Sequence, residues 1–328
     1  SGKQPVATQT DLRGKHIIVT GASPGSIGFE AALTLASWGA TVIITTRSNP
    51  EATANQLRAR LKHQGTSGKI DAHVLDLTQP QSVIEFTGWY EQHYGDRLDV
   101  LLNNAGAHLD LTGKWKQPQL SPDGFEIHWR TNYLGPLQLT HRLLPLLRKT
   151  GKSVGEARVV FVSSHVHQRA SNAGLFTPPQ HYDSWVAYGQ SKLALIHSAF
   201  EIQRRFASDN VQGFALHPGS IYTNIASKGL ANKPWLLALR NFFAPLEKMV
   251  LLTPQQGAQT SILCASQPGL RGGQYFERCA PGICSTELND TATAARLWQQ
   301  TETWVHSLQT EPLSSQSAST SRQASAHV

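Results

Sequence analysis

A glycine-rich turn follows a short apolar run in the sequence Lys15-His16-Ile17-Ile18-Val19-Thr20-Gly21-Ala22-Ser23-Pro24-Gly25-Ser26-Ile27-Gly28. The apolar run has the length and β-branched content of a buried parallel strand. Residues 29–38 then repeat apolar side chains at helical spacing. Between a strand and a helix, glycines permit a close approach of backbone to a pyrophosphate, and the helix N-terminus offers free N–H groups. The context predicts a dinucleotide-binding turn with contacts from Gly21, Ser23, Gly25, Ser26, Ile27 and Gly28.

The end of the next predicted strand indicates which dinucleotide binds. Residues 40–46 form that strand, and Arg47 and Ser48 follow without an acidic residue. An acidic side chain there would hydrogen-bond the ribose hydroxyls of NAD, whereas an arginine beside hydroxyl groups suits the 2′-phosphate of NADP. We therefore expect NADP(H), bound at this point by Thr46 and Arg47. The alternative is that Arg47 is an ordinary solvated loop residue.

Tyr188 and Lys192 form a second chemical signature. They stand four residues apart at the start of an apolar helical run, so both side chains project from one helix face. A free tyrosine titrates near pH ~10, and a nearby ammonium favours the phenolate and lowers that pKa. We expect Tyr188 to act as a general acid or base beside Lys192. This common pattern gains weight from the nucleotide-binding turn upstream.

Further motifs occur in a fixed order along the chain. They are Asp76-Leu77 after a third predicted strand, Asn103-Asn104-Ala105-Gly106 after a fourth, Thr131-Asn132-Tyr133-Leu134-Gly135, Ser163-Ser164 after a fifth strand, and Pro218-Gly219 after a sixth. With these motifs the chain resembles the short-chain dehydrogenase/reductase family over residues 15–308. Four further segments resemble its retinol dehydrogenase-like branch, namely residues 123–135, 253–260, 273–276 and 295–298.

Strand and helix patterns alternate from Lys15 onward, which predicts an α/β chain with a doubly wound parallel sheet and helices on both faces. The resemblance implies a single-domain Rossmann fold, which we place at residues 11–310. Residues 1–10, which start with Ser1-Gly2 as an expression-vector remnant, and the Ser/Ala/Gln-rich residues 311–328 are expected to be disordered.

The family resemblance also implies the catalytic roles. Tyr188 would exchange a proton with the substrate oxygen during hydride transfer, and Lys192 would lower the tyrosine pKa and hold the nicotinamide ribose. Ser164 would hydrogen-bond the same substrate oxygen, while Ser163 would point away because strand side chains alternate. Asn132 would bind a water molecule that relays protons to Lys192.

The remaining cofactor contacts follow from the same resemblance. The expected set is Asp76, Leu77, Asn103, Ala105, Gly106, Tyr188, Lys192, Pro218, Gly219, Ile221 and Thr223. His217 is expected to be structural, because Tyr188 already supplies the acid–base group. The last two glycines of the turn, Gly25 and Gly28, are one residue further apart than is usual in the family, which leaves open which N–H groups meet the pyrophosphate.

Two long segments leave the carboxyl ends of predicted strands, where ligands of doubly wound sheets bind. They are residues 107–122 and the stretch between Ser164 and Tyr188. Residues 224–250 would form a lid in this family, and their apolar content suits a lipophilic substrate. A packed helix face and a shallow membrane-surface helix are the alternatives for that segment. Candidate substrate contacts are His108, Trp115, His165, Trp185 and Trp235.

Composition excludes several classes of function. The 328 residues carry a net charge of +7, with a pI near 9.4, but no block of five cations, so nucleic-acid binding is not expected. Three cysteines without a C-x-x-C pair fit a reducing cytoplasm. The histidines show no metal-ligand spacing, and we predict no metal. No apolar stretch is long enough for a membrane span; peripheral contact stays open. The family implies a homodimer or homotetramer.

The expected function is that of an NADP(H)-dependent oxidoreductase which interconverts a lipophilic or bulky carbonyl and its alcohol. One alternative is a tailoring ketoreductase for a polyketide-type secondary metabolite. The alternative from another class is a non-catalytic NADPH-binding regulatory or scaffold protein. The intact set of Asn132, Ser164, Tyr188 and Lys192 argues against that last alternative.

Overall fold

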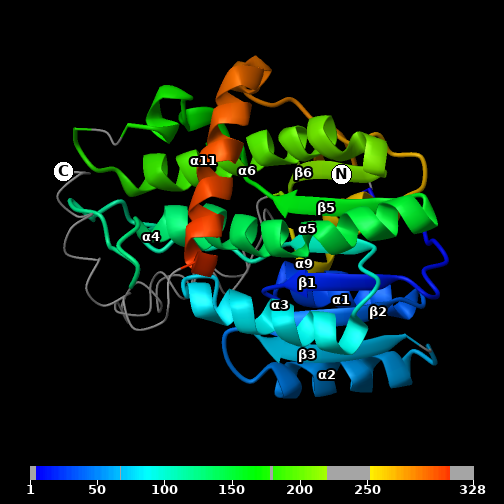
Figure 1. Ribbon diagram of the computed structural model, residues 1–328. Helices are drawn as coiled ribbons and strands as arrows, with labels where there is room; N and C mark the ends of the chain where they lie inside the picture. Colours follow the sequence, from blue (N-terminus) through cyan, green and yellow to red (C-terminus); the bar gives the residue numbers. More distant parts are fainter. Residues whose placement is uncertain (1–4, 67, 178–179, 220–251, 311–328) are drawn as a thin grey trace, which may run out of the picture.

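The computed structural model describes residues 5–66, 68–177, 180–219 and 252–310 (Figure 1). Within them, eight strands form one sheet in the order β3-β2-β1-β4-β5-β6-β7-β8. The strands are β1 His16–Thr20, β2 Thr41–Thr46, β3 Lys69–Val74, β4 Val100–Asn103, β5 Ala157–Val162, β6 Val211–His217, β7 Gln274–Glu277 and β8 Ala280–Pro281. All neighbours are parallel except β7 and β8.

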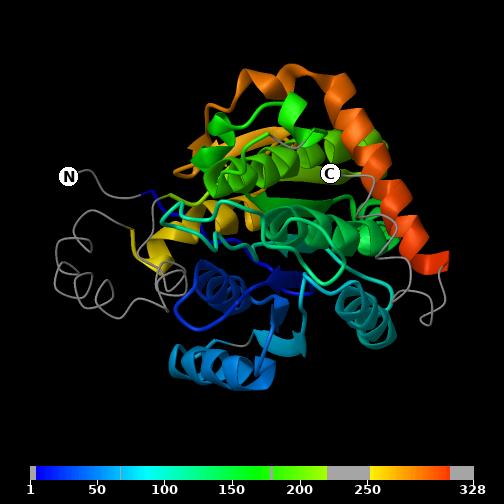
Figure 2. The same ribbon diagram turned by 90° about the vertical axis from the view of Figure 1, so that its left-hand side faces the viewer.

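Helices cover both faces of this sheet. They are α1 Ile27–Ser37, α2 Pro50–His63, α3 Pro80–Tyr94, α4 Ile127–Trp129, α5 Gly135–Val154, α6 Ser184–Phe206, α9 Pro254–Gly257, α10 Gln259–Ser266 and α11 Thr291–Thr310. Figure 2 shows α11 and the segment of α9 and α10 (yellow) on opposite sides of the molecule. The predicted Rossmann fold with helices on both faces is confirmed.

Strand alternation divides the buried side chains into two cores. Ile18 and Ile43 face the core formed with α3, α5 and α6, whereas Ile17 and Val42 face the core formed with α1, α2 and α10. Successive side chains of a strand point to opposite faces, so a strand buried on both sides must be apolar throughout. This requirement explains the uninterrupted apolar runs of the sequence.

The chain reverses its direction across the sheet between β3 and β4. It runs outward from β1 through β2 to β3 and then returns to place β4 on the other side of β1. The connections that follow β1 and β4 therefore leave the sheet in opposite directions, and doubly wound sheets bind their ligands in the crevice at such a point, at the carboxyl ends of the strands. The glycine-rich turn follows β1 and the Asn104 loop follows β4, so both border this crevice.

The N-terminal segment is more ordered than its composition suggests. Residues 5–10 were expected to be disordered, but Ala7 is buried and its N–H donates to Gln259 Oε1 at 3.1 Å. Leu12 is also buried in the core beside α1. The expectation was therefore wrong for residues 5–10, because it considered sequence periodicity and not a distant partner on α10. Residues 1–4, the expected lid and the C-terminal tail lie outside the described residues.

Helix α11 packs across α5 and α6 (Figure 1). It buries Leu297, Trp298 and Val305 against these helices. The Trp298 ring contacts His141 on α5, with 4.4 Å between ring centroids, and Phe206 on α6, at 5.8 Å. No helix among the described residues is long and apolar enough to cross a bilayer.

Candidate active site

The glycine-rich turn packs tightly against the loop after β4. Gly21 has a φ of +69°, and a Cβ there would lie 2.8 Å from Ala105 Cα. A Cβ on Gly28 would lie 2.9 Å from the Gly21 carbonyl oxygen and would also overlap the Asn104 amide. Asn104 Nδ2 donates to the Thr20 carbonyl at 2.8 Å, which fixes the turn from below. The turn therefore has backbone surfaces that only glycine can provide.

Ser26 has a role in the helix that follows the turn. Its hydroxyl accepts a hydrogen bond from Phe29 N–H at 3.1 Å and caps α1. The hydroxyl also lies 3.3 Å from the Gly21 carbonyl, to which it donates. Ser26 thus holds the N-terminus of α1 against the turn, with Ile27 and Gly28 in the first helical residues, where free N–H groups suit a phosphate.

Tyr188, Ser164 and Lys192 meet at the carboxyl end of β5. Ser164 follows that strand, and its hydroxyl is close enough to the Tyr188 hydroxyl to lower the pKa of that tyrosine. Tyr188 lies near the start of α6, and Lys192 follows one turn later with its Nζ 5.5 Å from the tyrosine ring centroid. The Lys192 ammonium donates to the Val162 carbonyl at 3.0 Å. Ser163 instead donates to the Lys192 carbonyl at 2.9 Å and so points away from Tyr188.

Burial dominates the charge states of this pair. It raises the pKa of Tyr188 to about 12, against the opposing effect of the Ser164 hydroxyl. It lowers the pKa of Lys192 to about 8. The expected depression of the tyrosine pKa is therefore wrong for this structure, because desolvation of the phenolate outweighs the ammonium, which is directed at Val162. Tyr188 is protonated at neutral pH.

The hydrogen-bond partners of the Lys192 ammonium indicate whether a nicotinamide ribose fits at this position. Its side chain is 3% exposed, and no carboxylate of the described residues forms a salt bridge with it. A buried ammonium with one carbonyl partner retains two unused N–H donors and is costly unless a further polar group joins it. The hydroxyls of a ribose would supply such partners, so the residues present fit the dinucleotide.

Asn132 lies in a π-helical turn, Arg130–Leu134, immediately before α5. Its Oδ1 accepts from Ala107 N–H at 2.8 Å, and its Nδ2 donates to the Ala107 carbonyl at 2.9 Å and to Ser191 Oγ at 3.2 Å. A Cβ on Gly106 would lie 2.9 Å from Lys192 Nζ. Asn132 thus clamps the loop that passes Lys192, as π-turns often do at functional sites. The proton relay through Asn132 stays a prediction.

The two asparagines after β4 take different directions. Asn103 Nδ2 donates to Thr140 Oγ1 on α5 at 3.1 Å, and its side chain is buried there. Asn103 was expected to contact the cofactor, but its side chain points away from the glycine-rich turn, because it alternates with Asn104 along the extended chain. The neighbour Asn104 meets the turn instead, and sequence reasoning did not assign it. Any cofactor contact of Asn103 must use its backbone.

Four other predicted cofactor residues lie at the carboxyl ends of β2 and β3. Thr46 donates to the Ser48 carbonyl at 2.8 Å, and Arg47 is exposed at the end of β2. Asp76 Oδ1 accepts from Thr78 N–H at 2.9 Å, and the Leu77 carbonyl accepts from Arg130. Ile221 and Thr223 lie outside the described residues.

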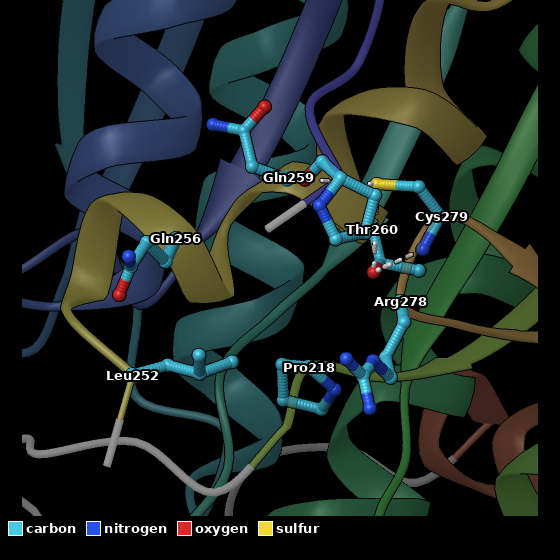
Figure 3. A pocket seen from close by; sticks show the side chains of 8 residues that line it. Pro218, Leu252, Gln256, Gln259, Thr260, Arg278 and Cys279 are labelled. Carbon is cyan, nitrogen blue, oxygen red and sulfur yellow. Dashed lines mark hydrogen bonds between the residues drawn. The ribbon is translucent and has the colours of Figure 1, made fainter. Parts of the chain in front are cut away.

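Pro218 and Gly219 end the described chain beyond β6. Gly219 has a φ of +90°, and a Cβ there would lie 2.5 Å from Leu252 Cδ1. Figure 3 shows Pro218 beside a small pocket, with Leu252 on one side and Arg278 on the other. Pro218 and Gly219 thus follow the carboxyl end of β6, and their contact with the cofactor stays a prediction.

Aromatic side chains border Tyr188 on one side. The His108 ring lies 4.9 Å from the Tyr188 ring and 4.2 Å from that of Trp185. Trp115 approaches through His128, at 5.8 Å between ring centroids. Burial lowers the pKa of His108 to about 4, so this imidazole is neutral. The structure thus brings His108, Trp115 and Trp185 together near the predicted acid–base group.

His165 lies beyond Ser164 on the other side. Its Nε2 is 2.8 Å from Glu277 Oε2 on β7, and its ring is 4.1 Å from that of His217. Burial lowers the pKa of His217 to about 3, as suits a neutral structural imidazole. Trp235 lies outside the described residues. The described residues contain no group of three or more His, Cys, Asp and Glu side chains that could hold a metal ion.

Sequence reasoning missed a buried hydrogen-bond network behind His108. Glu126 Oε1 accepts from His128 Nδ1 at 2.7 Å and from the Tyr182 hydroxyl at 2.9 Å. His128 Nε2 accepts from Leu109 N–H at 3.0 Å. This network ties the loop after β4 to the segment before α6. The only sequence signal was the density of polar residues in two long segments that leave neighbouring strands.

A family model described as short chain dehydrogenase matches residues 15–233. The chain belongs to the short-chain dehydrogenase family. Retinol dehydrogenase 14 of Mus musculus is 35% identical over 306 residues, which cover 90% of this chain and 86% of the mouse protein. A Streptomyces antibioticus protein named "Probable oxidoreductase" is 34% identical over 308 residues, with coverage of 88% and 97%. These relatives support the retinol dehydrogenase-like branch.

Solved structures agree with this short-chain dehydrogenase fold. A Mycobacterium paratuberculosis protein has a TM-score of 0.65 at 29% identity, over 92% of this chain and 98% of its own. A short-chain dehydrogenase of Shigella flexneri, solved in complex with NADP, has a TM-score of 0.63 at 24% identity, over 83% and 100%. The family makes this chain an oxidoreductase of the type that interconverts CH–OH and carbonyl groups.

Proposed function

We propose that this short-chain dehydrogenase is an NADP(H)-dependent oxidoreductase for a lipophilic or bulky carbonyl and its alcohol. The observation that carries the proposal is the grouping of Ser164, Tyr188 and the buried Lys192, with the Lys192 Nζ 5.5 Å from the Tyr188 ring centroid. These residues lie at the carboxyl end of β5, on the same edge of the sheet as the glycine-rich turn. Ligands of doubly wound sheets bind at this edge.

The charge state of Tyr188 is the one from which carbonyl reduction starts. A bound nicotinamide dinucleotide would supply or accept the hydride. Tyr188, with a pKa raised to about 12, holds its proton at neutral pH and is ready to donate it to a carbonyl oxygen. Ser164, which lies beside the Tyr188 hydroxyl, would stabilise negative charge that develops on the same oxygen. Oxidation would require Tyr188 to lose its proton, which burial opposes.

Two observations support NADP(H) over NAD(H). The exposed Arg47 stands at the end of β2 beside Thr46, and no acidic residue occupies the strand end. A guanidinium there offers bidentate bonds to a phosphate. The similar Shigella flexneri dehydrogenase was solved with NADP. The cofactor preference proposed here rests mainly on Arg47.

The walls near Tyr188 support a lipophilic or bulky substrate. His108, Trp115 and Trp185 offer aromatic surface, and the neutral His108 carries no charge to desolvate. Ligand sites for apolar molecules combine such walls with a few polar anchors. The mouse relative is named a retinol dehydrogenase, which agrees with a lipophilic substrate. His165 and Trp235 complete the proposed substrate contacts, and an assembly of two or four copies is proposed from the family.

The test is NADPH consumption by the purified protein with retinal, a long-chain aldehyde, a steroid ketone and a bulky aromatic ketone. We expect turnover with one class, faster with NADPH than with NADH. Tyr188→Phe should keep NADPH binding and lose about 10²- to 10⁴-fold in kcat, the usual contribution of a positioned acid. Full activity of that variant would remove Tyr188 from the mechanism. NADPH binding without turnover on any carbonyl would instead favour the non-catalytic alternative.

A further inference from the structure

A hydrogen bond between two buried hydroxyl groups links helix α11 to the π-turn. Thr301 of α11 donates to the Leu297 carbonyl at 2.9 Å, so its proton is already used. The 2.6 Å contact between Tyr133 Oη and Thr301 Oγ1 must then have the tyrosine as donor. Both side chains are buried, with Tyr133 fully inaccessible. Ser198 of α6, whose hydroxyl donates to the Ala194 carbonyl at 2.9 Å, lies close enough to the Tyr133 hydroxyl to lower its pKa. Tyr133 therefore joins α11, α6 and the turn that contains Asn132.

A second contact holds the other end of the turn. The Arg130 guanidinium lies over the Trp304 ring, 5.2 Å from its centroid, and Arg130 is fully buried. It donates to Asp123 Oδ2 and to the Leu77 carbonyl, both at 2.7 Å. A buried guanidinium with this many partners has one orientation. Arg130 and Tyr133 thus both contact α11, and Asn132 lies between them in the sequence.

We propose that α11 is a positioning element of the active site and that Thr301, through Tyr133, sets the placement of Asn132. This inference rests on the proposed function for its kinetic consequence. Asn132 hydrogen-bonds both the N–H and the carbonyl of Ala107. At the adjacent Gly106, an added Cβ would lie 2.9 Å from Lys192 Nζ, so this loop packs closely against the ammonium. A shift of the π-turn would move the Ala107 loop against the ammonium. Thr301 and Tyr133 are positioning residues, since neither borders the reacting groups.

Simple packing does not account for the hydroxyl at position 301. Leu297, Trp298 and Val305 bury the apolar face of α11 without it. Valine has nearly the shape of threonine, so Thr301→Val preserves the packed volume and removes the hydroxyl that accepts from Tyr133 and donates to the Leu297 carbonyl. Thr303 is a matched control on the same helix. Its hydroxyl donates to the Gln299 carbonyl at 2.9 Å, as Thr301 does to Leu297, but its side chain is exposed.

The direct test is amide hydrogen exchange of Ala107 in the full chain without substrate. The Ala107 N–H is protected by Asn132 Oδ1, so its exchange rate reports the clamp. We expect Thr301→Val to speed this exchange about tenfold, since a factor of ten is the effect of one modest interaction. Thr301→Ser keeps the hydroxyl and should exchange at the wild-type rate. Thr303→Val should also leave the rate unchanged. Unchanged Ala107 exchange in Thr301→Val would overturn the proposal. So would an equal effect of Thr303→Val.

Steady-state kinetics provide a second test of the proposal. Thr301→Val should lower kcat about tenfold with an unchanged KM for NADPH, because small displacements of site residues cost one to two powers of ten. Tyr133→Phe should have the same effect, and the double variant should be no slower than either single one, as residues that act through one contact are not additive. Loss of thermal stability with unchanged kcat would show a structural role only. A wild type without turnover would contradict the proposed function, while Ala107 exchange would still decide the positioning.

Discussion

Arg47 is the residue on which the proposed preference for NADP(H) mainly rests. It is exposed at the end of β2, where a carboxylate would repel the additional phosphate of NADP. We expect Arg47→Asp to weaken NADPH binding about 10- to 100-fold, which corresponds to one lost hydrogen bond with a charged group. NADH binding should change little. Titration of both cofactors by fluorescence measures the difference, and an equal loss for both would mean that Arg47 does not contact the phosphate.

Lys192 should control the alkaline limit of cofactor binding. Burial lowers its pKa to about 8, so the ammonium is present below that pH and is lost as the pH rises through it. NADPH affinity of the free enzyme should therefore be constant from pH 6 to 7.5 and weaken above about 8. Lys192→Met should bind NADPH more weakly and show no such decline. A profile that is flat to pH 9.5 in the wild type would contradict the lowered pKa.

The close packing of the glycine-rich turn requires residues without a Cβ atom. A Cβ on Gly28 would lie 2.9 Å from the Gly21 carbonyl and would displace the Asn104 amide beneath it. Gly28→Ala should open the turn and weaken NADPH binding about tenfold or more, since 1.4 kcal/mol already gives that factor. Gly88→Ala is the control, because Gly88 of α3 has open space around its Cβ position. That variant should bind NADPH normally and gain about 0.5–1 kcal/mol of stability.

Elements with strong local signals were predictable from the sequence. The strand, turn and helix around Gly21 and the helix of Tyr188 and Lys192 follow from periodicity and glycine placement, and the structure has them in place. The π-turn at Asn132 was not predictable, because its hydrogen bonds are made with Ala107 and Thr301, which are distant from it in the sequence. The same reason explains the N-terminal residues that bind Gln259. The alternation of side chains along a strand would have predicted opposite directions for Asn103 and Asn104, but this requires knowing where β4 ends.

At the scale of the whole molecule, α11 secures one of the two cores. Trp298 is 2% exposed and contacts His141 and Phe206. Trp298→Ala should therefore lower the free energy of unfolding by about 3–5 kcal/mol, as buried aromatic truncations do. Trp115→Ala, in a half-buried loop position, should cost less than about 1 kcal/mol. Urea denaturation of both variants checks the difference, and similar losses would mean that α11 adds little to the core.

The two edges of the sheet differ in their capacity to accept another strand. The edge formed by β3 has six residues, and the last of them, Val74, is exposed. The opposite edge ends in β8, which has two residues, and the second is Pro281. Proline lacks the N–H that a further strand would need, and so short an edge offers almost no template. The protein is thereby protected against fibril-like growth at the β8 edge, and any strand-to-strand polymerisation under stress should begin at β3.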